Sequence, residues 1–188
     1  MNRRKFIRNT SIIAGTLAAG GTGFAVIFDK KTSHQPLGIR EVRFTTLAEA
    51  REELERIERA KELTLSGEWD LYQNLIHCAQ SIEYSLTGYP KNRNPLFQQT
   101  LGTLVFNKFN KQGYMAHHLN EPIPKAPAIQ PKGQLERAFF RVRKAIDDFQ
   151  RHQGIYKEHF AYGELSKAEY DKAHAMHLAD HFSGMKYV

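Results

Sequence analysis

The sequence predicts an all-α fold, in which a bundle of four main helices is joined by one shorter, less regular helix and a long proline-rich loop. Apolar residues recur at helical spacing in successive segments, which is the primary signal of amphipathic helices. Thr46 with Glu49, and Ser166 with Glu169, have the spacing of a capping box at a helix start. No stretch alternates with a period of two for long enough to form a sheet. Helix-on-helix packing is therefore the expected architecture.

The first two expected helices are separated by a break at Ser66-Gly67. The first begins at Thr46, with apolar residues on one face and two Glu-to-Arg pairs, four residues apart, on the other. The second spans about Glu68–Leu86. Cys78 lies in its apolar stripe and is expected to be an inert buried side chain. Because Cys78 is the single cysteine, an internal disulfide and a multi-cysteine zinc or iron–sulfur site are excluded.

The third expected helix begins at Asn94-Pro95, which supplies a cap and a first-turn proline, and ends near Phe109. It is expected to be the short element, with Leu96 and Leu104 among its buried positions. Residues 113–132 then carry four prolines, which excludes a helix or a central strand. We expect a long loop there, either ordered over the domain or partly mobile.

The last expected helix, about 166–185, follows a fourth at about 134–152 and carries three histidines. At 100° per residue, His174, His177 and His181 share an arc about 60° wide, which coincides with the apolar face. Burying neighbouring imidazoles is unfavourable unless a metal ion takes their lone pairs. His at i and i+4 is a chelating spacing on a helix, so this face predicts metal ligands.

A third ligand is expected from another helix, because two imidazoles do not complete a stable site. His77 is the candidate, inside the apolar second helix but at the edge of its buried stripe. His77 could instead be an interfacial histidine bonded to a carbonyl. The three histidines of the last helix could be a partly exposed face, where imidazolium complements the helix dipole. His117 and His118, in the proline-rich loop, are expected to be a solvated pair.

The net charge of +7 comes mainly from the N-terminal region. Residues 1–31 hold six Lys and Arg against one Asp, a net +5, so the remaining residues 32–188 carry only +2. A domain that binds nucleic acid through its phosphates should keep a concentrated basic face, and no such stripe is visible. Nucleic acid is therefore not an expected partner.

Residues 1–31 resemble a twin-arginine export signal, because Arg3-Arg4 precede a hydrophobic pair, another base and an apolar run rich in Gly and Ala. An ordinary secretion signal or a plain membrane anchor would share the basic residues and the apolar run. The resemblance implies export of a folded protein, often with its cofactor loaded, by the twin-arginine machinery. We expect a periplasmic protein, or one anchored to the outer face of the bacterial cytoplasmic membrane if the segment is uncleaved. The expected division is 1–31 signal or anchor, 32–43 linker and 44–188 helical domain.

The second and last helices resemble the DinB/YfiT-like superfamily of metalloenzymes, and within it a bacterial domain family of unknown function. The residues that carry the resemblance are Trp69–Ser85, Tyr162–Ser166 and His174–His181. The resemblance implies a DinB-like four-helix bundle of up-down-down-up type with three histidines around a divalent ion. Those histidines would be His77, His177 and His181. His174 would be an outer-shell group or an alternate ligand.

The expected function is a divalent-metal-dependent enzyme of unknown reaction, with hydrolase- or thiol-transferase-like chemistry. Three histidines leave an open coordination position, and the superfamily's characterised relatives include thiol-dependent S-transferases and isomerases. The alternative is a non-catalytic exported module that binds metal for structure, storage or sensing. Zinc is the first expectation, with nickel, iron or manganese as alternatives; the small-molecule substrate is unknown, and a homodimer is compatible with this function. Tyr84 is a candidate proton donor or outer-shell partner, and Asp171 a candidate to orient His174.

Overall fold

The computed structural model describes residues 39–188. The predicted export signal or anchor, residues 1–31, lies outside the described residues, as do residues 32–38 of the predicted linker. Val42, near the end of that linker, is buried in the core. Within the described part of the chain, no helix combines the length and the apolar character needed to cross a bilayer.

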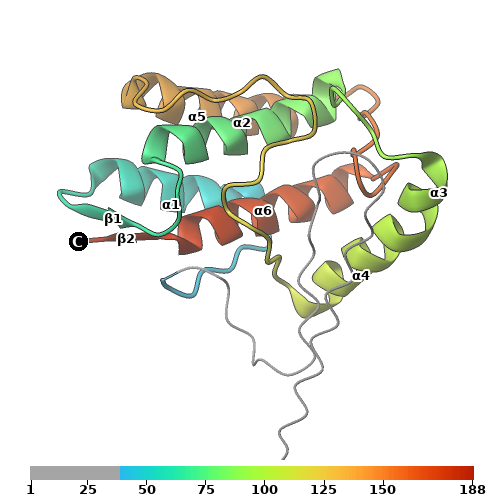
Figure 1. Cartoon of the computed structure of the whole chain (residues 1–188), viewed down its shortest axis with the longest axis horizontal. Helices are drawn as coiled ribbons and strands as arrows, with labels where there is room; N and C mark the ends of the chain where they lie inside the picture. Colours follow the sequence, from blue (N-terminus) through green and yellow to red (C-terminus); the bar gives the residue numbers. More distant parts are fainter. Residues whose placement is uncertain (1–38) are drawn as a thin grey trace, which may run out of the picture.

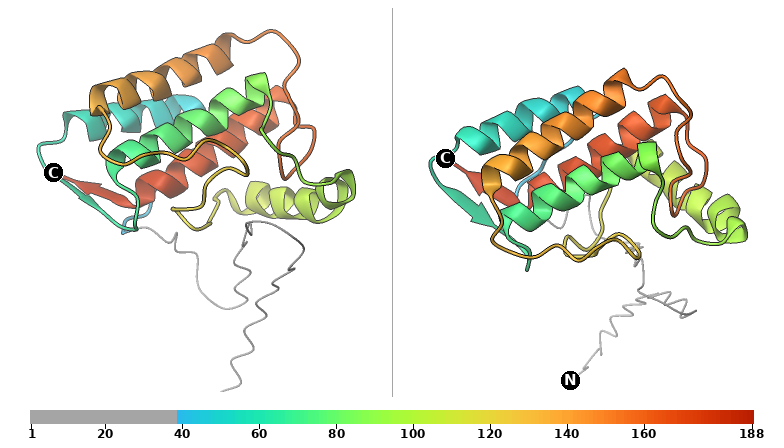
Figure 2. Two further views of the ribbon diagram at one scale, coloured as in Figure 1. Left: turned by 45° about the horizontal axis from the view of Figure 1, so that its top comes forward. Right: turned by 90° about the horizontal axis from the view of Figure 1, so that it is seen from above.

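Four long helices lie side by side and make up much of the described chain (Figures 1 and 2). They are α1 (Leu47–Arg59), α2 (Leu71–Thr87), α5 (Leu135–Arg151) and α6 (Lys167–Ser183). Helix α2 packs against α5 and α6, and α1 packs against the same two helices. The prediction of a mostly helical fold is confirmed.

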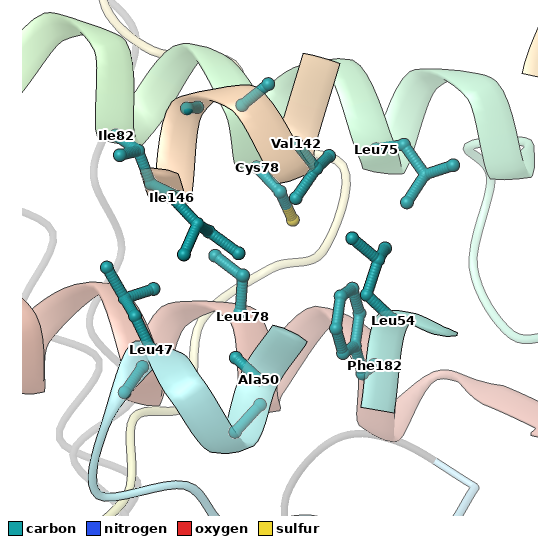
Figure 3. Close-up of a cluster of buried hydrophobic side chains, with 14 of the residues drawn as sticks. Leu47, Ala50, Leu54, Leu75, Cys78, Ile82, Val142, Ile146, Leu178 and Phe182 are labelled. Atoms are coloured by element: carbon teal, nitrogen blue, oxygen red, sulfur yellow. The ribbon is translucent and has the colours of Figure 1, made fainter. Parts of the chain in front are cut away.

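A hydrophobic core lies between these four helices, and each helix contributes buried residues at helical spacing (Figure 3). The labelled members are Leu47, Ala50, Leu54, Leu75, Cys78, Ile82, Val142, Ile146, Leu178 and Phe182. Burial of each large aliphatic side chain contributes about 2 kcal/mol to folding. The Cys78 thiol points into this core, where burial raises its pKa, as expected of an inert side chain.

Side-chain caps set the helix starts. The predicted capping box at Ser166 is confirmed. Thr46 caps α1 as predicted, but the Glu49 carboxylate accepts from the backbone N of Thr45, so the predicted box with Thr46 is not closed. Helix α2 starts at Leu71, slightly later than predicted, because Asp70 and Gln73 form a capping box of their own. The Asp70 carboxylate accepts from the backbone N of Gln73 at 2.8 Å, and the Gln73 side chain accepts from the backbone N of Asp70 at 3.2 Å.

A two-stranded antiparallel sheet joins the α1–α2 connection to the segment after α6. Strand β1 (Leu63–Leu65) pairs with β2 (Met185–Tyr187), with Leu63 opposite Tyr187. The predictions of a fold without a sheet and of a last helix that reaches Met185 are therefore wrong. Each strand has three residues, too few for a period-two pattern to be recognised.

The predicted third helix is less regular, as expected, but it continues past its predicted end. It consists of α3 (Pro95–Phe97), a π-helical turn η1 (Gln98–Gly102) and α4 (Thr103–Gln112). Asn94 caps it as predicted. Leu96 and Leu104, predicted to be buried, are 73% and 67% exposed. For Leu104 the reason is the π turn, which inserts an extra residue and rotates the helix face that follows it. A side chain at Gly102 would place its Cβ 2.0 Å from the carbonyl oxygen of Ala161.

Helix α4 lies beside one end of α6, outside the four long helices (Figure 1). A second hydrophobic cluster fills the space between α4, α6 and the turn that precedes α6. Its buried members are Val105, Phe106, Phe109, Met115, Phe160, Ala161, Tyr162, Ala173 and Met176.

The proline-rich segment, residues 113–134, crosses α6 and then α2 on its way to α5 (Figures 1 and 2). It contains no helix or strand, as its prolines predict. The backbone N of Lys132 donates to the Asp70 carboxylate at 2.6 Å, and Nε2 of Gln73 donates to the carbonyl of Ile129 at 3.0 Å. The cap of α2 therefore also holds this loop against the helices.

Candidate metal centre

Four histidines meet between α2, α6 and the proline-rich segment. His77 comes from α2, His177 and His181 from α6, and His117 from the proline-rich segment; one ring nitrogen of each lies within 4.8 Å of the others. The structure thus brings the three predicted residues of the triad together. Three of the four rings are buried, and His177 is partly buried.

The prediction that His117 is solvated is wrong. The sequence predicts a solvated pair with His118, and the structure separates the two: His118 is exposed, whereas His117 is 5% exposed and belongs to the cluster. The loop is fixed at this point because the backbone N of His117 donates to the Asp180 carboxylate on α6 at 2.9 Å. A local sequence pattern cannot reveal a contact between a loop and a distant helix.

The tautomer of His181 is set by Asn74 on α2. The Asn74 amide nitrogen donates to the carbonyls of Trp69 and Asp70, at 3.1 and 2.9 Å, so its oxygen is the group that faces Nδ1 of His181 at 2.9 Å. An amide oxygen accepts only, so Nδ1 carries the proton. The Nε2 atom of His181 then holds a lone pair, and it is buried with no hydrogen-bond partner.

Ser81 sets the tautomer of His177 in the same way. The Ser81 hydroxyl donates to the carbonyl of Cys78 at 2.9 Å and lies 3.1 Å from Nδ1 of His177. Because its single proton is used, the hydroxyl accepts from Nδ1. The free lone pair of His177 is therefore on Nε2, which faces the cluster.

Asp180 holds His117 through the ring as well as the backbone. Nδ1 of His117 lies 2.6 Å from the carboxylate oxygen that accepts its backbone N–H. Two lone pairs would repel at this distance, so the proton lies on Nδ1. The Nε2 atom is buried without a partner. A carboxylate behind an imidazole in this way is a common outer-shell arrangement in metal sites.

His77 completes the cluster, with its Nε2 atom 3.2 Å from Nε2 of His177. Two ligands of one tetrahedral ion, each about 2.1 Å from it, would lie about 3.4 Å apart. The ring of Trp69 covers the cluster from the outside, with centroids 5.0 Å from His77 and 6.4 Å from His181. The distances and the donor set therefore fit one shared cation.

Three histidines of the cluster, His77, His177 and His181, are held in the neutral form. Burial, and then the neighbouring His117, lower the pKa of His77 to about 3. Burial and the surrounding histidines also lower the pKa of His177 and of His181 well below the usual value. Near pH 7 these imidazoles are uncharged, which is the state that binds a metal ion.

The remaining candidate residues lie outside the cluster. His174 is buried on α6, with its ring 5.4 Å from Phe149 and 5.2 Å from Tyr170, and its Nε2 has no hydrogen-bond partner. The Asp171 carboxylate accepts from the backbone N of Leu47 at 3.1 Å. No contact in the described structure joins Asp171 to His174.

Tyr84 also lies apart from the cluster, with its ring 5.7 Å from that of Tyr89. The groups that contact the Nδ1 atoms of the cluster are instead Asn74, Ser81 and Asp180, none of which was predicted from the sequence. Asn74 stands three residues before His77, and Ser81 stands four residues after it, in an otherwise apolar helix. These spacings place the three side chains in one polar stripe on α2, which could have indicated that Asn74 and Ser81 lie near the site.

A cavity of about 50 Å³ lies against the cluster. His77, His117 and His177 form part of its wall, and His159 and His174 line it as well. The candidate metal centre thus has a neighbouring space for a small molecule.

These features define a helical protein with a buried cluster of four histidines that is compatible with a metal ion. The chain belongs to the family described as "Protein of unknown function (DUF1569)", whose model matches residues 38–187. No curated protein and no solved structure matches the chain.

Proposed function

We propose that the protein binds one divalent metal ion through His77, His177 and His181, with His117 as an additional ligand. The observation that carries this proposal is the common orientation of three rings, in which Nδ1 lies next to an oxygen atom and Nε2 faces the cluster. Nδ1 is hydrogen-bonded in His181 and His177, and in His117 it lies 2.6 Å from the Asp180 carboxylate. The Nε2 atoms of His181 and His117 are buried without a hydrogen-bond partner, and lone pairs that gather in a buried space repel one another unless a cation is present. Imidazole ligands suit zinc, nickel, iron and copper, and zinc remains our first expectation.

We further propose that the bound ion makes the protein a metal-dependent enzyme. A divalent ion here would supply Lewis-acid chemistry, polarising a carbonyl or activating a water or thiol. The cavity beside the cluster favours this role, because a structural site needs no space for a second molecule. The chain's own residues would hold the ligands in place and exclude bulk water with the proline-rich segment.

The second candidate is a non-catalytic module that binds metal for structure, storage or sensing. The fourth histidine favours it, since four protein ligands close a tetrahedral coordination sphere. Access to the ion separates the two candidates. In cobalt-substituted protein, 2-mercaptoethanol should change the visible spectrum if the ion accepts an external ligand, and an unchanged spectrum would favour the structural role.

Metal analysis tests the site itself. Untagged wild-type protein should contain about one equivalent of metal, and the His77→Ala and His181→Ala variants should lose it. His118→Ala is the matched control, because His118 is exposed and adjacent to His117 in the chain. Equal metal content in all four proteins would reject the proposed ligands.

The fold family and the cellular location are proposed as well. We propose that the four long helices form a DinB/YfiT-type four-helix bundle, and that residues 1–31 direct export of the folded protein through the twin-arginine machinery to the periplasm. The histidine positions on α2 and α6 support the first point, and Arg3-Arg4 supports the second. Replacing both arginines by lysine should leave the protein in the cytoplasmic fraction, and unchanged export would contradict this route.

A further inference from the structure

The cavity beside the cluster has largely apolar walls from three parts of the chain. Met115 and Ile123 come from the proline-rich segment, Phe160 and Tyr162 from the turn before α6, and Ala173 from α6. A volume of about 50 Å³ corresponds to about three to five water molecules. The cavity therefore admits a molecule of similar size, with an apolar body.

The charges around the cavity favour an uncharged molecule. Glu121 is the only Asp, Glu, Lys or Arg among the described residues that line the cavity. The Asp180 carboxylate lies behind His117. No Lys or Arg from the described part of the chain lines the cavity, so an anion would find no side chain of opposite charge there. Moving an unpaired charge into apolar surroundings is strongly unfavourable.

Two further histidines line the cavity away from the cluster, and their ring nitrogens can bond to a polar group of a ligand. His174 is 3% exposed, and its Nε2 is buried without a hydrogen-bond partner. His159 accepts from the backbone N atoms of Ala161 and Tyr162 at 3.2 Å each, so its proton lies on Nε2. Buried polar groups are normally paired, so the unpaired nitrogen of His174 points to a missing partner.

We propose that this cavity is the binding site for a small, uncharged, mainly apolar molecule with one polar group, enclosed between the histidine cluster and His174. The proposal rests on the proposed metal site, which it deepens by naming the class of ligand. Ala173 and Glu121 both line the cavity, so a larger side chain at position 173 would reduce its volume, and the Glu121 carboxylate disfavours anions.

Propionamide and propionate test the proposal, because they share size and shape and differ in charge. Each is titrated by calorimetry into metal-loaded, full-length protein. Propionamide should bind at least tenfold more tightly than propionate. Ala173→Val should weaken propionamide binding at least tenfold without changing metal content, because the added methyl groups fill the cavity. Ala168→Val, an exposed position on the same helix, is the matched control and should change neither.

The role of Glu121 has its own readout. Glu121→Gln removes a negative charge, so propionate should bind more tightly while propionamide binding stays the same. Tighter binding of propionate than propionamide to the wild type would overturn the ligand class. Propionamide binding that Ala173→Val leaves intact, or no binding up to about 100 mM, would overturn the site itself.

The same titrations separate the two proposals. If the protein binds metal stoichiometrically and propionamide does not bind, the cavity inference fails and the metal site stands. If the protein takes up no metal, the proposed function fails. Titration of the metal-free wild type and Ala173→Val then decides the cavity: binding lost in the variant supports it, and absence of binding overturns it.

Discussion

The protein bonds its buried histidines in opposite senses in the four-histidine cluster and at His159, which lies in the turn before α6. In the four-histidine cluster, Asn74, Ser81 and Asp180 face the Nδ1 atoms as acceptors, which leaves the Nε2 lone pairs free. At His159, two backbone amides donate to Nδ1 and use its lone pair. Burial lowers the pKa of His159 well below its usual value, just as it does in the cluster.

The difference shows that burial and neutrality do not distinguish a ligand from a structural histidine. His159 and three histidines of the cluster, His77, His177 and His181, are all held uncharged near pH 7 by burial. The distinguishing mark is which lone pair the surrounding protein leaves unused. The ring of His159, stacked on Tyr162 with centroids 4.2 Å apart, is part of the packing of its turn. The cluster rings are arranged around a common point.

Removing the metal should give the largest effect. An ion present at about 1,000 times its dissociation constant stabilises the folded state by about 4 kcal/mol. A chelator should therefore lower the melting temperature by roughly 8–16 °C, measured by thermal unfolding at pH 7.5. His77→Ala should melt at the same temperature with and without chelator. An equal chelator effect in wild type and variant would contradict the comparison.

His159→Ala should reduce stability strongly and leave metal content unchanged. The substitution removes the acceptor of two buried amides and the stacked ring, which we expect to cost about 3 kcal/mol. Urea unfolding measures the loss, and metal analysis of the same sample measures occupancy. Loss of metal would mean that His159 takes part in metal binding, which would contradict the difference between His159 and the cluster.

Ser81→Ala should weaken metal binding about 10- to 100-fold, the usual range for an outer-shell partner. Competition with a coloured chelator measures this affinity. Ser85→Ala is the matched control, because the Ser85 hydroxyl makes the same type of bond, to the carbonyl of Ile82 at 2.6 Å. If both variants bind metal equally well, the Ser81 hydroxyl does not orient His177.

The smallest effect concerns pH. Burial lowers the pKa of His174 to about 3, below its value of about 6.5 in the unfolded chain, so below pH 6.5 the unfolded state binds more protons. Metal-free protein should lose about 1.4 kcal/mol per such histidine between pH 7.5 and 5.5. In urea unfolding, the His174→Phe variant should lose about 1.4 kcal/mol less stability than the wild type over the same pH range. An unchanged loss would mean that His174 is not held neutral.

Much of the helical fold was predictable because its signals are local. The cap at Thr46 and the apolar spacing of α1 act within a few residues, so they are visible in the sequence. The π turn of η1 and the β1–β2 pairing were not visible. The turn depends on a close approach between Gly102 and the backbone of Ala161, and the pairing depends on distant segments meeting.

The site residues show the same division between local signals, which the sequence reveals, and long-range contacts, which it does not. His177 and His181 share one helix face, so their spacing predicts that they act together, and His77 interrupts an apolar pattern. His117 could not be predicted, because its position depends on how a loop without periodic structure meets Asp180. Its neighbour His118 has the same chemistry and lies in solvent.

The cluster joins side chains that are a hundred positions or more apart along the chain, as the contact between His77 and His177 shows. The coordinating geometry can form only after α2, α6 and the proline-rich segment have docked, so capture of a cation would come at the end of folding. Interactions absent from the folding transition state slow unfolding and leave the folding rate nearly unchanged. The ion would then stabilise a protein that has already folded, and its release would be the first step of unfolding.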